Sequence, residues 1–219
     1  YFLGGEKHMW AYIKDNKIEE IIARPKDMVI DDIRHSRRIF TAWTWDELNA
    51  IGIYTVEPGT KGNDRFETTS QPTYTFDSSN KKVTTKYTTT DKALDDTEAK
   101  DEDGKNMLDE NGNKIINLGL KTIAKNECKT TAHEFIKRFG WLVQRVTMDS
   151  SATIPSAVTT YCAAIRKDCD DICTAIDNAS DMDAFKGLYA DELNSDGSIK
   201  TVNRINRWTT DSTVTDYIR

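Results

Sequence analysis

The stretch LGLKTIAKNECKTTAHEFIKRF, residues 118–139, decides the fold of the C-terminal half of this chain. Its apolar residues recur every three or four positions, which predicts an amphipathic helix of about six turns. Gly140 is expected to end this helix, because glycine readily adopts the left-handed conformation found after a helix C-terminus. The apolar positions are Leu120, Ile123, Ala124, Cys128, Ala132, Phe135, Ile136 and Phe139.

Two more helices are expected downstream, after an aromatic-led run at residues 141–146 that is predicted to be a strand or an extended arm. Pro155 suits the first turn of a long helix that reaches about Asn178, since proline is preorganised for that position. Residues 180–183 are expected to cap a shorter helix that runs through Tyr189. Residues 117–190 are therefore predicted to form a helical hairpin or a three-helix module.

The last segment, residues 191–219, is polar and contains a few isolated apolar side chains. Such a tail is expected either to be disordered or to dock onto a neighbouring subunit. We expect docking, with Trp208 and Tyr217 as anchors, because large aromatic side chains dominate the energetics of protein interfaces.

The N-terminal part shows strand patterns instead of helical ones. Apolar runs at residues 10–13 and 18–22 flank the polar residues 14–17 and predict a hairpin. A second hairpin is predicted from residues 74–76 and 83–87, and residues 57–72 are expected to be a loop. Between them, Thr44 and Glu47 have the spacing of a capping box, which predicts a short helix through Ala50 followed by a strand at residues 53–56.

The two parts are joined by a charged, polar stretch. Residues 91–100 have a helical pattern, and residues 101–112 carry Asp and Asn around two glycines. Calcium binding is one interpretation of that composition, but the order of residues departs from the EF-hand loop, and turns made by Asp and Asn side chains are favoured. The chain is thus predicted to be an α+β protein with a β-rich module (9–88), a polar helix and linker (89–116), a helical module (117–190) and an interacting tail (191–219).

Four cysteines, Cys128, Cys162, Cys169 and Cys173, contain no CxxC spacing. Three of them lie on or beside the apolar stripe of the long helix 155–178, so we expect small buried side chains with reduced thiols. A metal site made by Cys169, Cys173 and His133 is the alternative, and the absence of an evident fourth ligand argues against it. No metal and no cofactor are expected.

Composition limits the classes of function. The formal net charge of −6 argues against nucleic acid as the main partner, and no apolar run has the roughly 20 residues of a membrane helix. The one basic cluster, residues 34–38, is expected to be a solvated strand or turn. The paired carboxylates Asp46–Glu47 and Asp170–Asp171 point to different faces of their helices, so no catalytic residue is predicted and the chain is expected not to be an enzyme.

Two sets of tryptophans need interpretation. Trp141 is expected to be buried against the helices. Trp43 and Trp45 flank the capping residue Thr44, and an exposed ring there would suit a subunit interface. We therefore include both among the predicted interface residues.

Two blocks of the sequence carry a resemblance to known proteins. The first comprises MWAYIKDNKI (residues 9–18), RHSRRIF (34–40) and IGIY (51–54), and the second extends from Gly140 to Ala190 with its W, P, Y and R residues. Together they resemble small structural proteins of marine tailed phages, and the second block is also similar to tail-fibre assembly proteins. Residues 1–8 precede the resemblance and are expected to be a leader or a remnant.

The resemblance implies a non-enzymatic virion component of the tail, the fibre or fibre adaptor, or a capsid decoration. Its partners would be copies of itself and other virion proteins, and its location the virion, after assembly in the cytoplasm of a host bacterium. Two alternatives stay open: a tail-fibre assembly chaperone, and a receptor-binding or carbohydrate-binding tail protein, for which exposed Trp10, Trp43 and Trp45 would be the sign.

Overall fold

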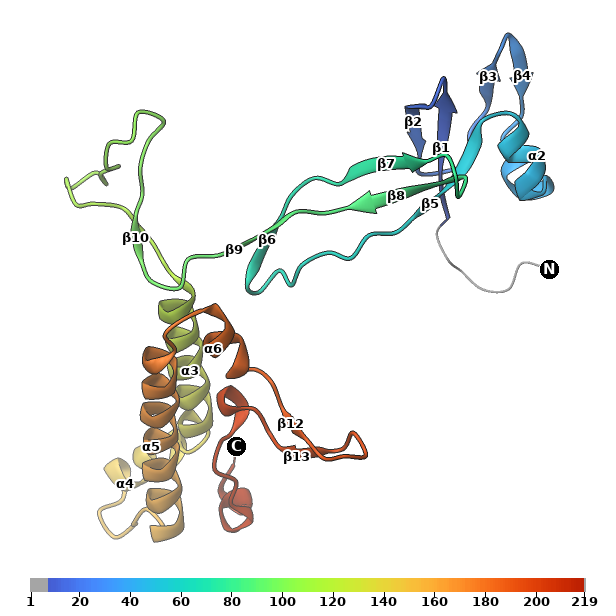
Figure 1. Cartoon of the computed structure of the whole chain (residues 1–219). Coiled ribbons are helices and arrows are strands. Elements are labelled where there is room, and N and C mark those ends of the chain that lie inside the picture. Colours follow the sequence, from blue (N-terminus) through green and yellow to red (C-terminus); the bar gives the residue numbers. More distant parts are fainter. Residues whose placement is uncertain (1–7, 219) are drawn as a thin grey trace. The chain divides into compact units, whose positions relative to one another are not determined.

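The computed structural model describes residues 8–218, and the chain divides into two compact units, Tyr1–Thr90 and Asp91–Arg219. Strands fill the first unit and the long helices belong to the second (Figure 1). The α+β class predicted from the sequence is confirmed at this level. The expected leader or remnant lies outside the described residues except for His8.

The first unit is built on a five-stranded sheet with the order β2-β1-β5-β8-β7. Neighbouring strands are antiparallel, except that β5 and β8 run parallel. Both predicted hairpins are confirmed, as β1–β2 and β7–β8. The strands are β1 (Met9–Lys14), β2 (Lys17–Ile22), β5 (Ile53–Glu57), β7 (Thr73–Asp77) and β8 (Lys82–Lys86).

The segment expected to be a loop, residues 57–72, contains a further strand, which corrects that expectation. This strand, β6 (Glu67–Thr69), pairs with β9 (Thr89–Asp91) in a separate two-stranded sheet. Its residues, Glu67, Thr68 and Thr69, are all polar, so the alternation of apolar and polar residues that predicts a strand is absent.

Two tight turns of the same kind close two of the hairpins of this unit. Asp15 and Asn16, with φ of 50° and 61°, join β1 to β2. Asp31 and Asp32, with φ of 46° and 65°, join β3 (Met28–Ile30) to β4 (Ile33–His35). Positive φ at both central residues is typical of the hairpin turn whose twist matches the flanking strands.

Two short helices, α1 (Ile39–Ala42) and α2 (Trp45–Ala50), pack against residues of β1, β2 and β5. The predicted capping box is confirmed, because the Thr44 backbone N–H donates to Glu47 Oε2 at 2.7 Å and the Glu47 N–H donates to Thr44 Oγ1 at 3.4 Å. The core beneath these helices consists of Trp10, Ile22, Met28, Ile30, Ile39, Phe40, Leu48 and Ile53.

The second unit is built on two long helices, α3 (Leu120–Lys137) and α5 (Ser156–Asn178), which pack side by side (Figure 1). Both confirm predicted helices. The shorter helix α6 (Met182–Gly187) begins as expected, with the Asp181 side chain accepting the Ala184 N–H. The buried residues are Leu120, Ala124, Cys128 and Ala132 on α3 and Val158, Cys162, Ile165, Cys169, Ile172 and Ile176 on α5.

The expected strand or arm at residues 141–146 is wrong. These residues belong to the helix α4 (Gly140–Met148), and Gly140 begins this helix instead of ending α3. The apolar run hid a helical spacing, since Phe139 and Leu142 are buried together and the Leu142 N–H donates to the Phe139 carbonyl at 3.0 Å. As expected, Trp141 packs against these residues.

The helix expected at residues 91–100 is also wrong. The backbone carbonyls of Ala93 and Leu94 accept the N–H groups of Leu120 and Lys121 at 2.9 and 3.0 Å, so an extended segment caps the start of α3. The first N–H groups of a helix have no partner inside it, which makes such acceptors valuable. A side chain at Gly119 would meet Asp95 backbone atoms at 2.3 Å, so glycine permits this close approach.

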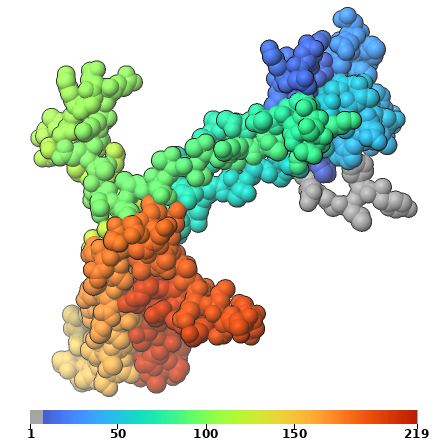
Figure 2. Space-filling model, viewed as in Figure 1, coloured from blue at the N-terminus to red at the C-terminus, as the bar shows by residue number. Residues whose placement is uncertain are grey.

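The two ribbons of the second unit contain three turns of the same kind, two in the ribbon at residues 97–117 and one in the ribbon at residues 192–201. Gly104, Gly112 and Gly197 adopt φ of 78°, 82° and 83° in turns at residues 101–105, 109–113 and 194–198. As predicted, the Asp101 and Asp109 carboxylates accept nearby backbone N–H groups. Figure 2 shows both ribbons standing clear of the helices. Their strands are β10 (Thr97–Glu98), β11 (Ile116–Asn117), β12 (Glu192–Leu193) and β13 (Ile199–Thr201).

The tail packs onto the helices of its own chain. Val214 is only 2% exposed and belongs to the cluster around Phe139 and Val158, and the Trp208 ring lies 5.5 Å from that of Phe135. These contacts correct the expectation of a disordered tail, because the apolar residues that looked isolated in the sequence meet apolar residues of α3 and α5. Docking of Trp208 and Tyr217 onto a neighbouring chain stays a prediction. Two 3-10 turns shape it, η1 (Arg204–Asn206) and η2 (Ser212–Tyr217).

Candidate functional site

The predicted interface tryptophans of the first unit lie at the surface beside the capping box. Trp45 is 43% exposed, whereas Trp43 is half-buried and makes an edge contact with His35 at 5.6 Å. A surface cavity of about 330 Å³ lies here, lined by residues 40–45 and Leu48. Of the two rings, Trp45 is therefore the more available to a partner.

Trp10 does not share this exposure. It is 6% exposed and its ring lies 4.9 Å from that of Phe40, inside the core. Burial removes it from the set of exposed aromatics expected of a carbohydrate-binding surface. Trp208 and Tyr217, the other two predicted interface residues, are half-buried within the second unit.

Exposed apolar side chains gather on the two-stranded ribbons. On β3–β4, Val29 and Ile33 are 66% and 62% exposed. The ribbon at residues 97–117 exposes Leu108 and Ile116, and the ribbon of β12–β13 exposes Leu193 and Ile199. A two-stranded ribbon is marginally stable alone and usually needs a third strand or a covering layer. The described residues provide no such cover for these side chains.

The basic cluster at residues 34–38 lies on β4 and the turn after it and is mostly exposed, as expected for a solvated segment. Its local partner is Asp27, whose carboxylate accepts the Arg37 backbone N–H at 2.8 Å and pairs with Arg34 at 3.5 Å. The Arg37 backbone N–H, and then the Arg34 side chain, hold the pKa of Asp27 below its ordinary value. These contacts give the cluster a structural role within its own hairpin.

The paired carboxylates also have structural roles. Glu47 completes the capping box, and hydrogen bonds from the Thr44 backbone and hydroxyl lower its pKa. Asp171 pairs with Lys167 at 2.7 Å one turn away. No catalytic role follows from this geometry.

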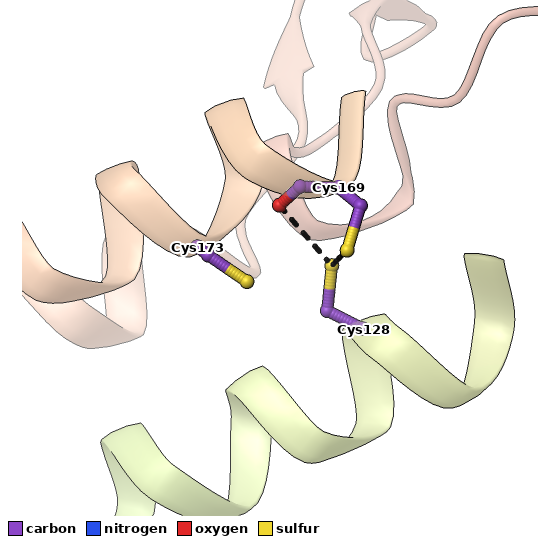
Figure 3. A group of neighbouring side chains, drawn as sticks. All are labelled: Cys128, Cys169 and Cys173. Carbon is purple, nitrogen blue, oxygen red and sulfur yellow. Dashed lines mark hydrogen bonds between the residues drawn. The ribbon is translucent and has the colours of Figure 1, made fainter. Parts of the chain in front are cut away.

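The cysteines form a cluster that the sequence did not predict (Figure 3). The Sγ atoms of Cys128, Cys169 and Cys173 all lie within 4.8 Å of one another, with Cys128 and Cys169 3.6 Å apart. Cys128 comes from α3 and the other two from α5. All four cysteines are free, and the expected burial on the helix face is confirmed for Cys162 and Cys169, while Cys173 is half-buried.

The alternative metal set contained His133 and is corrected here. His133 instead lines a second cavity, of about 270 Å³, at the junction of α3, α4 and α5. Burial raises the pKa of the thiols of Cys128 and Cys173 above the ordinary value. Both groups are therefore neutral thiols near pH 7. Cys128 was the missed member because only the pairing of α3 with α5 brings it to the other two.

Comparisons with known proteins found no matching family model, curated protein or solved structure. No helix in the described part of the chain has the length and apolar character needed to cross a membrane.

Proposed function

We propose that this chain is a non-enzymatic structural component of a tailed-phage virion, located in the tail, the fibre or its adaptor, or on the capsid as a decoration. It would act by repeated assembly with copies of itself and with other virion proteins. The proposal rests on the sequence resemblance, and its physical support is the set of apolar side chains on uncovered ribbons.

The ribbons supply the assembly surfaces in this proposal. Val29 and Ile33 on one ribbon and Leu108 and Ile116 on another are exposed, although burial of such a side chain contributes about 1.5–3 kcal/mol. An unpaired strand edge also offers backbone N–H and C=O groups to a further strand. A neighbouring chain that covers a ribbon would bury the apolar side chains and pair with the free strand edge.

The helical module would be the rigid part of the subunit. In this proposal α3 and α5 form a helical hairpin, α4 adds a third helix, and the tail secures the end of the unit. Assembly would then use Trp45 and the ribbons, in place of the tail anchors expected from the sequence.

The carbohydrate-binding alternative loses support because Trp10 is buried, which leaves Trp45 as the more exposed ring near the small cavity. The chaperone alternative predicts a protein that is absent from mature particles. Mass spectrometry of purified particles from the source phage tests this point. Multiple copies per particle would support a structural component, and absence from the particle would contradict it.

Assembly itself can be tested with the purified chain. We expect a homo-oligomer or a larger array in light scattering, and a lower mass for the double variant Leu108→Lys/Ile116→Lys. Glu102→Lys adds a positive charge to the same ribbon at an exposed polar position and is the matched control. Circular dichroism should be unchanged for both variants. A wild-type protein that stays monomeric when concentrated would contradict self-assembly.

A further inference from the structure

Three sulfur atoms from two helices meet between α3 and α5, and no part of the proposed assembly uses them. We infer that Cys128, Cys169 and Cys173 form a binding site for one thiophilic d10 metal ion, zinc or copper(I).

The spacing of the sulfurs suits one shared ion. Zinc–sulfur bonds of about 2.3 Å place two sulfurs roughly 3.8 Å apart in a tetrahedron and roughly 4.0 Å apart in a trigonal plane. The Cys128 and Cys169 sulfurs are 3.6 Å apart, and all three lie within 4.8 Å of one another. Binding therefore requires only small side-chain rotations, and Figure 3 shows the three sulfurs directed toward a common point.

The helices hold these positions in place. Cys169 and Cys173 are four residues apart, so they lie on the same face of α5. Ile172 and Ile176 are fully buried beside them, and on α3 the small residues Ala124 and Ala132 flank Cys128 at one-turn spacing. Lys125 on α3 also pairs with Asp177 on α5 at 2.7 Å, near the same level. A preorganised set of ligands loses less freedom on binding than a set on mobile loops.

The donor atoms select the class of ion. Thiolates favour zinc and copper(I), whereas magnesium and calcium take oxygen ligands. The ligand group found among the described residues contains sulfur alone. Copper(I) can be three-coordinate, and zinc would take a water molecule as its fourth ligand on the side of Cys173, the half-buried member.

The charge balance of the step is simple. Three thiols and Zn²⁺ give a tris-thiolate complex of charge −1 and three protons, and copper(I) gives a complex of charge −2 and three protons. Lys125 and Lys129 both act electrostatically on Cys173 and would offset this negative charge. No oxidant or reductant takes part.

The test uses the full chain, reduced and stripped of metal. Cd²⁺ is the spectroscopic probe, because cadmium–thiolate bonds give an ultraviolet charge-transfer band. We expect the band to saturate at one ion per chain. Zn²⁺ and copper(I), added separately against a chelator, then show which ion binds more tightly. Displacement of cadmium by either ion supports the site.

Variants separate a metal site from a packed thiol cluster. Cys173→Ser and Cys128→Ala should each weaken binding by more than the roughly tenfold that loss of an outer-shell partner costs. Cys162→Ala is the matched control, since Cys162 is a buried cysteine of α5 outside the cluster, and its affinity should stay at the wild-type value. Cys173→Ser keeps the test decisive if Cys128→Ala fails to fold. A wild-type protein without a charge-transfer band, or a Cys173→Ser protein that binds as wild type does, would overturn the inference.

Discussion

The indole N–H of Trp141 donates a hydrogen bond of 2.9 Å to the backbone carbonyl of Tyr217, 76 residues further along the chain. This bond ties the end of the tail to α4. It lies beside Val214, which is buried against Phe139 and Leu142, and the Thr209 N–H donates to the Asp168 carboxylate at 2.6 Å. The tail is therefore part of the second unit's core.

Trp141→Phe should loosen the tail. The variant keeps an aromatic ring but leaves the Tyr217 carbonyl without its donor, so we expect a loss of about 1 kcal/mol in the free energy of unfolding. Hydrogen exchange at residues 212–217 should speed up. Val143→Ala, on an exposed position of the same helix, is the control. Unchanged exchange in the tail would show that the indole bond does not hold it.

Ile172 should be among the most sensitive positions of the second unit. It is fully buried between α5 and α3, so Ile172→Ala should reduce the free energy of unfolding by about 2–5 kcal/mol. Ile123→Ala removes the same atoms from an exposed position of α3 and should cost less than about 0.5 kcal/mol. Chemical denaturation of both variants measures the difference, and equal losses would contradict the burial of Ile172.

Thr44→Ala tests the capping box of α2. It removes the side-chain acceptor of the Glu47 N–H and should cost about 1 kcal/mol in the free energy of unfolding. The control is Thr60→Ala, in an exposed loop of the same unit. Thermal denaturation followed by circular dichroism measures the loss. If Thr60→Ala lost as much stability as Thr44→Ala, loss of the cap would not be the cause of the effect.

Asp96 should make the second unit sensitive to acid. The backbone N–H of Gly119, and then the Thr122 side chain, lower the pKa of Asp96 below its ordinary value of about 3.9. A carboxylate whose pKa is lower in the folded state stabilises the fold above the pKa of the unfolded state. This stabilisation is lost as the pH falls below about 4 and through the pKa of the folded state.

Asp96→Asn should therefore have a lower melting temperature than wild type at pH 7, and the two curves should converge as the pH falls below about 4. Asp103→Asn is the control, because Asp103 lies at an exposed turn away from the start of α3. A constant difference between wild type and Asp96→Asn at every pH would show that the charge of Asp96 is not the stabilising factor.

The sequence predicted those helices and hairpins that depend on residues near one another in the chain. The 3.6-residue spacing of Ala124, Cys128 and Ala132 predicted α3, and the Thr44–Glu47 pair predicted α2, because both signals depend on neighbours in the sequence. The hairpin of β1 and β2 was equally clear from its flanking strands. The turn at Asp31 and Asp32 was missed because its two strands, β3 and β4, have only three residues each and β4 overlaps the basic cluster.

The rest depends on contacts that no local pattern contains. Residues 91–100 have a composition that favours a helix. The carbonyls of Ala93 and Leu94 instead accept the first N–H groups of α3, and this contact stabilises an extended backbone. The apolar run of α4 was predicted to be a strand or an extended arm. In the structure it is a helix, with Leu142 buried in one cluster with Phe139 and Val158. Cys128 lies beside Cys169 and Cys173 because of the register in which α3 and α5 pack. That register cannot be predicted from the spacing of the cysteines in the sequence.

The turns at Gly104, Gly112 and Gly197 have a practical consequence. Each turn is held by its own backbone and side-chain hydrogen bonds, and each tip is exposed. Additional residues at such a tip would extend outward without entering either core, since exposed loop tips tolerate insertions well. The three tips are thus suitable positions for inserting a foreign peptide or attaching a fluorescent label. A tag fused after Tyr217 would instead lie next to the segment that packs against the helices.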